Sequence, residues 1–266
     1  MLKDITIGQY YPTGSFIHKL DPRTKILITM AYIVGLFIIK QFIAYGLIIL
    51  FVAAAIQISK IPFNYMIKGL KPLRVIILLT FAINLFMTPG ESIYTLGPLN
   101  MTREGLHQGV FMAIRLMMLV IGTSLLTLTT SPIALTDGIE NLLKPFSKIG
   151  VPAHELAMMM TIALRFIPTL LEETDKIMKA QMARGADFES GNIIKRAKSL
   201  VPLLVPLFIS AFRRADDLAM AMEARCYRGG DNRTRMKQLK MAAADFTSMA
   251  VTGLVLVVLV YIRIVY

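Results

Sequence analysis

Cysteine is almost absent from this sequence, because Cys226 is the only one among 266 residues. A single thiol excludes an internal disulfide framework and leaves no cysteine cluster for a metal ion. The histidines are scattered, and His154-Glu155 lacks the second histidine that a zinc protease carries at helical spacing. There is also no Walker A loop (GxxxxGKS or GxxxxGKT), so this chain itself is not expected to hold the phosphates of ATP.

Two further features are missing, a long run of charge and a cleavable leader. Residues 1–22 contain no apolar stretch typical of a signal peptide, so we expect the first apolar segment to direct membrane insertion. The formal net charge of +12 could suggest a nucleic acid partner, but the lysines and arginines form no single run. They flank apolar stretches instead, which is the pattern of an inner-membrane protein, so no nucleic acid partner is expected.

Apolar residues, by contrast, are abundant. They make up 55% of the chain, and the mean hydropathy is +0.61. A soluble globular domain carries about 45–50% apolar residues, which is less than this chain has. The composition therefore indicates a protein that crosses the lipid bilayer several times.

The apolar stretches predict five membrane-spanning helices, because one crossing takes about 20 apolar residues. The stretch Ile26–Ile58 is too long for one ordinary crossing, and Lys40-Gln41 interrupts it, which predicts two helices joined by a tight turn. One long tilted or interfacial helix is the alternative. Thr102 is a plausible N-cap, and Pro89-Gly90 is a turn signal. The predicted spans are about 25–40, 42–58, 73–88, 105–129 and 246–262.

Charge predicts the orientation of these spans. With the N-terminus inside, the inner loops hold seven basic residues, whereas the outer loop at 89–102 is nearly neutral. Two further apolar stretches, Leu156–Leu171 and Leu200–Phe212, are short and contain proline. Spanning by either one alone would put a basic cluster outside, so we expect both on the cytoplasmic side, with a seven-span protein as the alternative. The basic residues assigned to the inner loops are Lys19, Arg23, Lys25, Lys60, Lys68, Lys71 and Arg74.

The sequence thus predicts an all-α polytopic membrane protein in three parts. Residues 1–130 form the N-terminal membrane part with four transmembrane helices, 131–245 a cytoplasmic module, and 246–266 the last transmembrane helix, which leaves the C-terminus outside. Ser131-Pro132 starts a short helix that runs to about Leu143. Two long helices follow at about 153–184 and 193–225. We expect kinks at Pro168, Pro202 and Pro206.

The two long helices end alike. Residues 175–184 align without gaps on residues 216–225, with identical residues at four equal spacings. An arginine at a helix C-terminus can satisfy the last carbonyl groups and complement the negative end of the helix dipole. Chemistry alone therefore leaves open whether the two arginines are local caps or contacts for a partner. The matched pairs are Asp175/Asp216, Ala180/Ala221, Ala183/Ala224 and Arg184/Arg225.

These helix ends carry a family resemblance. Ala183-Arg184-Gly185 and Ala224-Arg225-Cys226 resemble the paired Ala-Arg-Gly motifs in the transmembrane (T) components of energy-coupling-factor (ECF) transporters. The stretches Leu20-Asp-Pro-Arg-Thr-Lys25 and Arg165-Phe-Ile-Pro168 are also similar to that family. The resemblance covers essentially the whole chain. The second motif departs from the family pattern in one residue, since Cys226 stands where glycine is more usual.

The resemblance implies a coupling subunit that is not itself an enzyme. Such a subunit links two cytoplasmic ATP-binding subunits to a membrane substrate-binding (S) component for vitamin or metal-ion uptake, and substrate choice belongs to that other chain. Arg184 and Arg225 would each dock in a groove of one ATPase. Ala183, Gly185, Ala224 and Cys226 would lie around them, and Asp175 and Asp216 would support them. No cofactor is expected in this chain, because ATP and magnesium would bind to the partner ATPases.

Two other classes compete with this interpretation. A secondary transporter binds its substrate near the membrane midplane, where acidic residues or broken helices are expected. Four of the five predicted spans lack Asp and Glu between their ends, and Arg115 is the only charge inside the fourth. A membrane-embedded enzyme needs convergent polar catalysts, and Asp216-Asp217 does not complete a DDxxD motif because Met220 takes the last position. Purification separates the classes, since a coupling subunit should copurify with ATPases.

Overall fold

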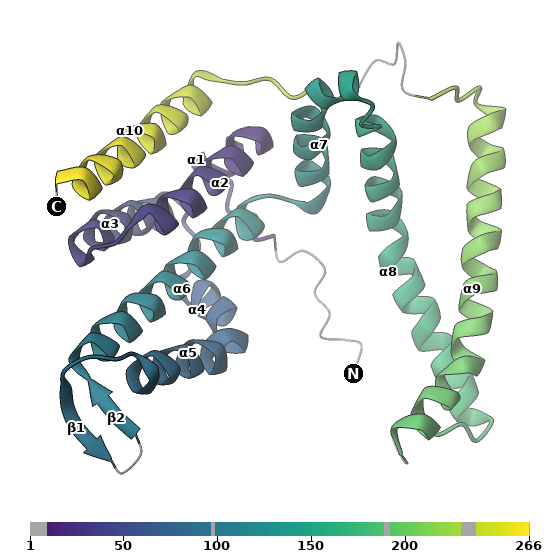
Figure 1. The fold of residues 1–266 in the computed structure, drawn as a ribbon. Coiled ribbons are helices and arrows are strands. Elements are labelled where there is room, and N and C mark those ends of the chain that lie inside the picture. The colour runs from purple at the N-terminus through teal and green to yellow at the C-terminus, as the bar shows by residue number, and fades with distance from the viewer. Residues whose placement is uncertain (1–9, 97–98, 189–191, 230–237, 266) are drawn as a thin grey trace. The chain divides into compact units, whose positions relative to one another are not determined.

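The computed structural model describes residues 10–96, 99–188, 192–229 and 238–265, with the backbone alone at 92–100, 193 and 195–197. The chain divides into two compact units, and each is described by itself. The membrane unit consists of residues 10–138 and 238–265. The hairpin unit consists of residues 139–229 and is named after its two long helices (Figure 1).

Helices dominate the membrane unit, and a β-hairpin adds two short strands. In chain order the elements are α1 (Phe16–Lys19), α2 (Pro22–Ile38), α3 (Phe42–Ser59), α4 (Phe63–Leu70), a 3-10 turn η2 (Lys71–Leu73), α5 (Arg74–Met87), β1 (Ser92–Leu96), β2 (Leu99–Thr102), α6 (Arg103–Thr129) and α10 (Ala243–Val265). The strands pair antiparallel, with an irregularity between Ser92 and Tyr94. This all-α architecture with several apolar helices confirms the predicted fold class.

The first apolar stretch forms two helices, as predicted, because α2 ends at Ile38 and α3 begins at Phe42. The third predicted helix, at 73–88, was placed too late in the chain. Helical backbone begins at Phe63 and continues through α4 and η2 into α5. Pro72 does not break this stretch, because it lies in the first turn of η2, where its missing N–H costs no helical hydrogen bond.

Five of the described helical stretches are long and apolar enough to cross a membrane: Phe42–Ser59, Phe63–Met87, Arg103–Thr129, Ala153–Ala183 and Ala243–Val265. The number equals the prediction, but the membership differs. Ala153–Ala183 qualifies by length and composition although we predicted it to be cytoplasmic. The 17 residues of α2 lie at the lower end of the range for a crossing.

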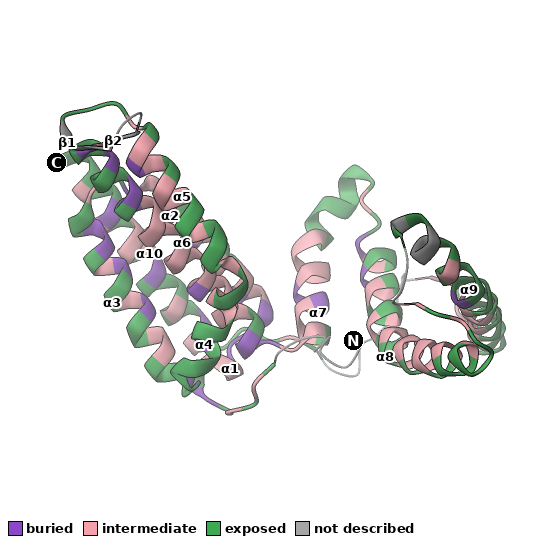
Figure 2. Ribbon diagram, turned by 90° about the horizontal axis from the view of Figure 1, so that it is seen from below, coloured by how far each residue is buried: buried purple, intermediate pink, exposed green. Residues whose placement is uncertain are grey.

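The core of the membrane unit lies where α2, α3, α6 and α10 pack together, and it includes Leu36, Tyr45, Phe111 and Leu259. Figure 2 shows these buried positions as purple bands on the helices. Tyr32 brings α2 close to α6, because its hydroxyl donates to the Met118 carbonyl over 2.7 Å. Its ring fills the space that a side chain at Gly122 would need. Glycine is therefore required at this crossing.

Arg115 is the interior charge of α6, and it is bound within the bundle. Its guanidinium donates to the carbonyl oxygen of Ile39 over 2.8 Å and to the hydroxyl of Tyr45 over 3.2 Å. The rings of Phe37 and Phe111 lie 5.6 and 4.9 Å from it. Ile39 is the C-cap of α2, so this cation lies where the helix dipole is negative.

Lys25 is a second cation that is bound within the protein, at the start of α2, whereas Arg115 lies at the end of that helix. Its ammonium group donates to the carbonyl oxygen of His18 over 3.1 Å and to that of Thr129, the last residue of α6, over 3.0 Å. Only 6% of Lys25 is exposed. We had assigned it to a basic inner loop, but it lies in the first turn of α2 and is buried. Instead it caps the end of α6 from inside the protein, where its positive charge meets the negative end of the helix dipole.

Two aspartates complete this junction. Asp21 is the N-cap of α2 and accepts the Arg23 backbone N–H over 2.9 Å. Asp245, with 1% exposure, accepts the backbone N–H groups of Asp21 and of Ala242, both over 2.8 Å. The bond to Ala242 is part of a capping box, in which an acidic side chain in the first helical turn accepts the backbone N–H of the N-cap residue. The start of α10 is thereby joined to the start of α2.

These contacts place four helix ends on one side of the membrane unit. The start of α2, the end of α6 and the start of α10 meet at Lys25, Asp21 and Asp245. The end of α3 joins them through Thr13, whose hydroxyl donates to the Ser59 carbonyl over 2.8 Å, and Tyr11 donates its N–H to the Leu128 carbonyl. The chain therefore leaves this unit after α6 and returns before α10 on the same side.

The hairpin unit contains the end of α7 (Pro132–Leu143), a 3-10 helix η3 (Lys144–Ile149), α8 (Ala153–Ala183) and α9 (Ile193–Ala224). The helix after Ser131 begins as predicted, with the Ser131 hydroxyl accepting the Ala134 N–H. Helices α8 and α9 run antiparallel, joined by an ion pair of 2.9 Å between Arg214 and Glu173. Gln181 donates to the Pro202 carbonyl, which has no helical donor because Pro206 lacks an N–H.

Replacing Asp245 tests how far the membrane unit depends on this junction. Asp245→Ala leaves the buried N–H of Asp21 unpaired, at a cost of about 1–3 kcal/mol, and also removes the acceptor of the partly buried Ala242 N–H, so the thermal unfolding midpoint of the purified protein in detergent should fall clearly. Asp245→Asn keeps one acceptor oxygen and should lose less. Thr247→Ala, an exposed change in the same turn of α10, is the control. Equal midpoints for all three variants would contradict the assigned role of Asp245.

Candidate coupling site at two helix ends

The first predicted motif lies at the end of α8. Ala183 is the last helical residue, Arg184 is the C-cap, and Gly185 adopts a left-handed conformation with φ of +88°. The Gly185 N–H donates to the Met182 carbonyl over 2.9 Å, and the Ala186 N–H donates to the Gln181 carbonyl over 2.9 Å. This pair of bonds, which spans four residues (182–185) and six residues (181–186), defines a Schellman turn.

The second motif closes α9 with the same two bonds. Ala224 is the last helical residue, and Cys226 adopts a left-handed conformation with φ of +55°. The Cys226 N–H donates to the Glu223 carbonyl over 2.8 Å, and the Tyr227 N–H donates to the Met222 carbonyl over 3.0 Å. The gapless alignment of the two sequence segments therefore corresponds to the same backbone turn. Cysteine in place of glycine does not change that turn.

The terminal carbonyl groups in these turns are bonded by backbone N–H groups. The side chains of Arg184 and Arg225 are both exposed, and within the described residues neither guanidinium has a hydrogen-bond or ion-pair partner. The backbone therefore closes both helix ends without an arginine side chain. This geometry weakens the alternative in which the arginines act as local caps, and it leaves both charges available to a partner.

The two predicted supporting aspartates differ in their surroundings. Asp175 forms an ion pair of 2.7 Å with Lys179 one turn further along α8. Asp216 is exposed on α9. Arg214, two residues before Asp216, pairs with Glu173 across the hairpin. The shared position of the two aspartates in sequence is thus not matched by a shared contact.

The antiparallel pairing of α8 and α9 puts the two motifs at opposite ends of the hairpin. Gln181, just before the first motif, lies beside Pro202 near the start of α9. At 1.5 Å per residue, the helix from Pro202 to the second motif at Ala224 is roughly 33 Å long. Two exposed arginines separated by that length can each meet a different partner molecule (Figure 1).

The sequence analysis missed a side-chain contact that lies next to the second motif. Tyr227, the residue that completes the α9 turn, lies with its hydroxyl 3.4 Å from Nε2 of His154. The other ring nitrogen of His154 lies 3.1 Å from the carboxylate of Glu140. The first motif has Ala186 at the position of Tyr227, and alanine has no side-chain hydrogen-bonding group. No sequence spacing relates these residues, because Tyr227 and His154 are 73 positions apart.

Residues 13–236 match the sequence model of the family described as CbiQ, cobalt transport protein. The chain is 69% identical over 256 residues to a protein of Thermosediminibacter oceani named energy-coupling factor transporter transmembrane protein EcfT. This alignment covers 96% of the chain and 97% of the relative.

Two other relatives carry the same name. The protein of Clostridium kluyveri is 66% identical over 259 residues, covering 97% of this chain and 96% of the relative. The protein of Bacillus subtilis is 48% identical over 262 residues, covering 98% of each. The chain belongs to the family of transmembrane (T) components of ECF transporters, and it is a multi-pass membrane protein.

The three-residue motifs at the two helix ends differ in one residue, Gly185 against Cys226, which gives a matched pair of substitutions. A residue with a side chain in the left-handed region costs roughly 1–2 kcal/mol relative to glycine. Cys226→Gly should therefore stabilise the end of α9, and Gly185→Ala should destabilise the end of α8 by a similar amount. Hydrogen exchange of the backbone amides in the last turn of each helix measures both effects. Exchange that is unchanged in both variants would show that the turns are not held as described.

Proposed function

We propose that this chain is the coupling subunit of an ECF-type importer, linking two cytoplasmic ATP-binding subunits to a membrane S component. The observation that carries the proposal is the repeated helix end, in which the same backbone turn presents an exposed arginine at each end of one helical hairpin. ATP hydrolysis and its magnesium belong to the partner subunits. This chain transmits the movement and catalyses no reaction itself.

Arginine suits such a contact for physical reasons. Its guanidinium is always charged and presents several N–H donors in a fixed plane, so it can hold a carboxylate or carbonyl groups while a partner moves. Ala183 and Ala224 lie beside Arg184 and Arg225 and leave space for the partner surface to approach. Each arginine would engage one ATP-binding subunit, because the two lie at opposite ends of the hairpin.

An apolar face on α9 supports a second contact, with the S component or with lipid. Seven large side chains recur at helical spacing, and all are exposed in the hairpin unit. Such a stripe needs cover from another apolar surface. In Figure 2 much of the α9 ribbon is green, the colour of exposed residues. Between α8 and α9 lies a cleft of about 300 Å³ with Phe166 and Leu218 in its lining. The exposed side chains are Leu200, Val201, Leu204, Val205, Phe208, Ile209 and Phe212.

The proposed orientation places the N-terminus and residues 130–245 in the cytoplasm. The excess of lysine and arginine in this segment supports it, by the rule that inner loops are positive. The hydrogen-bonded junction adds support, since the chain leaves and re-enters the membrane unit on one side. The segment between must therefore cross the bilayer an even number of times. If this segment does not cross the bilayer at all, its basic residues stay out of the hydrocarbon.

The cargo is proposed at the level of its class, a vitamin or a metal ion. In this assembly the S component would bind the cargo, and the chain described here would not. The matching family is described as cobalt transport protein, and the relatives are named only as energy-coupling factor transporter components. All five spans first predicted lack acidic residues between their ends, which agrees with a subunit that holds no cargo at the midplane.

The only cysteine tests the orientation without any substitution. Cys226 is exposed and lies in the segment proposed to be cytoplasmic. A membrane-impermeant maleimide should leave it unlabelled in intact cells and label it after solubilisation in denaturing detergent. Glu91→Cys in a Cys226→Ser background places a thiol on the proposed outer loop and should react in intact cells. Rapid labelling of Cys226 in intact cells would reverse the proposed orientation.

The arginines test the coupling role directly. Arg184→Ala and Arg225→Ala should each weaken transport per assembled complex, and the double variant should abolish it. Each change removes charge-assisted hydrogen bonds worth about 1.5–3 kcal/mol apiece. The measurement is uptake of radiolabelled cargo into vesicles that contain the whole transporter, together with ATPase activity and copurification of the ATP-binding subunits.

Matched variants separate docking from stability. Arg228→Ala removes an exposed arginine three positions after Arg225 and should leave transport unchanged. Arg184→Lys and Arg225→Lys keep the charge without the planar donor set, so they should rescue only part of the loss. Local capping predicts a different outcome, a stability loss of about 0.3–1 kcal/mol per site with normal transport per folded complex. That outcome would refute the coupling role of the arginines.

A further inference from the structure

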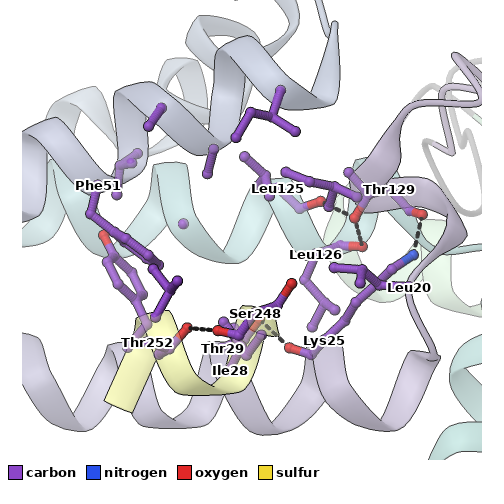
Figure 3. Close-up of a pocket in the computed structure, with 18 of the residues that line it drawn as sticks. Leu20, Lys25, Ile28, Thr29, Phe51, Leu125, Leu126, Thr129, Ser248 and Thr252 are labelled. Atoms are coloured by element: carbon purple, nitrogen blue, oxygen red, sulfur yellow. Dashed lines mark hydrogen bonds between the residues drawn. The ribbon is translucent and has the colours of Figure 1, made fainter. Parts of the chain in front are cut away.

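The membrane unit contains a cavity of about 310 Å³ close to the junction formed by Lys25, Asp21 and Asp245. The N-terminal parts of α2 and α10 and the C-terminal parts of α3 and α6 line it, together with residues of α1. Figure 3 shows Phe51, Leu125, Leu126 and Ile28 around the empty space. These side chains are apolar, so the lining is almost entirely carbon.

The polar groups in the lining are already bonded to the protein. The hydroxyls of Thr29, Thr129 and Ser248 each donate to a carbonyl one turn earlier in their own helix, over 2.7–2.8 Å. Thr252 does the same, and the Lys25 ammonium group donates to two carbonyls. A buried water needs two to four polar partners, and these groups leave few. The cavity is therefore suited to an apolar occupant.

The mouth of the cavity opens between membrane helices. Three of its lining residues are about half exposed, namely Phe16 on α1, Ile58 on α3 and Val251 on α10. Because α3 and α10 are apolar enough to cross the bilayer, the medium at this opening is lipid. The nearest abundant apolar molecule is the acyl chain of a phospholipid.

Two basic residues near the opening of the cavity favour a phospholipid with an anionic headgroup. Lys19 follows Phe16 within one helical turn, and Lys60 is the C-cap of α3, two residues after Ile58. Both ammonium groups are exposed, and within the described residues neither has a hydrogen-bond or ion-pair partner. Anionic headgroups attract basic residues at a membrane surface. The same end of the membrane unit thus has an apolar cavity and two exposed ammonium groups.

We propose that this cavity binds one acyl chain of an anionic phospholipid whose headgroup contacts Lys19 and Lys60. A volume of 310 Å³ is about twice that of the 150 Å³ apolar cavity that binds benzene, so the cavity has room for part of an acyl chain. The bound chain fills the gap between α3 and α10 beside the junction. The site lies in the cytoplasmic leaflet if the proposed orientation is correct, but lipid binding itself does not depend on the coupling function.

Photolabelling tests the site in the assembled transporter. The probe is phosphatidylglycerol with a diazirine on one acyl chain, added to the complex in nanodiscs of phosphatidylcholine, and cross-linked residues are mapped by mass spectrometry. Ile28 and Leu125, which are only partly exposed, should be labelled. Ala55→Phe places a ring in the cavity and should reduce that labelling several-fold, whereas Ala53→Phe, an exposed change on α3 outside the lining, should not.

Three controls make the outcome decisive. Retained elution of the intact complex shows that the Ala55→Phe variant is folded, and Val251→Trp is a second way to obstruct the mouth. Lys19→Gln with Lys60→Gln should remove the preference for phosphatidylglycerol over an equivalent phosphatidylcholine probe while labelling of the cavity persists. Labelling confined to outward-facing residues such as Leu254, or unchanged by both obstructing variants, would overturn the proposal. An equal response to both probes in the unmodified protein would overturn the headgroup assignment.

Discussion

The membrane unit depends on a buried ammonium group that holds helix ends from distant parts of the chain. Lys25 bonds the final carbonyl of α6, and Asp245 joins the starts of α2 and α10 beside it. A buried cation is costly unless its charge and its donors are matched. Here a helix dipole and two carbonyls supply the match. The arrangement fixes the side of the unit at which the polypeptide departs into the hairpin and returns from it.

Features that depend on neighbouring residues were predictable from the sequence. The capping residues Thr102 and Ser131, the break between α2 and α3, and the ends of α8 and α9 all follow from local composition and helix chemistry. The burial of Lys25 was not predictable, because its partner Thr129 lies 104 positions away. The start of the third membrane helix was also missed, since Pro72 signals a break in sequence but lies where a helix tolerates it.

The candidate site could also be predicted from the sequence, because it too depends on neighbouring residues. A helix end is a local structure, so two ends with the same residues at the same spacing form the same turn, and Cys226 accepts the strained conformation that glycine would adopt freely. The sequence could not show which groups close the terminal carbonyls. The structure assigns that task to backbone N–H groups and leaves the guanidinium groups of Arg184 and Arg225 exposed. The role of these groups is therefore to be sought in contacts outside the chain.

The contact of Tyr227 with His154 makes the two ends of the hairpin mechanically unequal. At α9 the turn is tied through a side chain to the root of α8 and on to Glu140 of α7, so a force applied there is shared by three elements. At α8 the equivalent residue is Ala186, whose side chain cannot form such a hydrogen bond. If the two arginines bind partners as proposed, the end at Arg225 is held more firmly than the end at Arg184. Identical motions of two partners would thus reach the hairpin with different amplitudes.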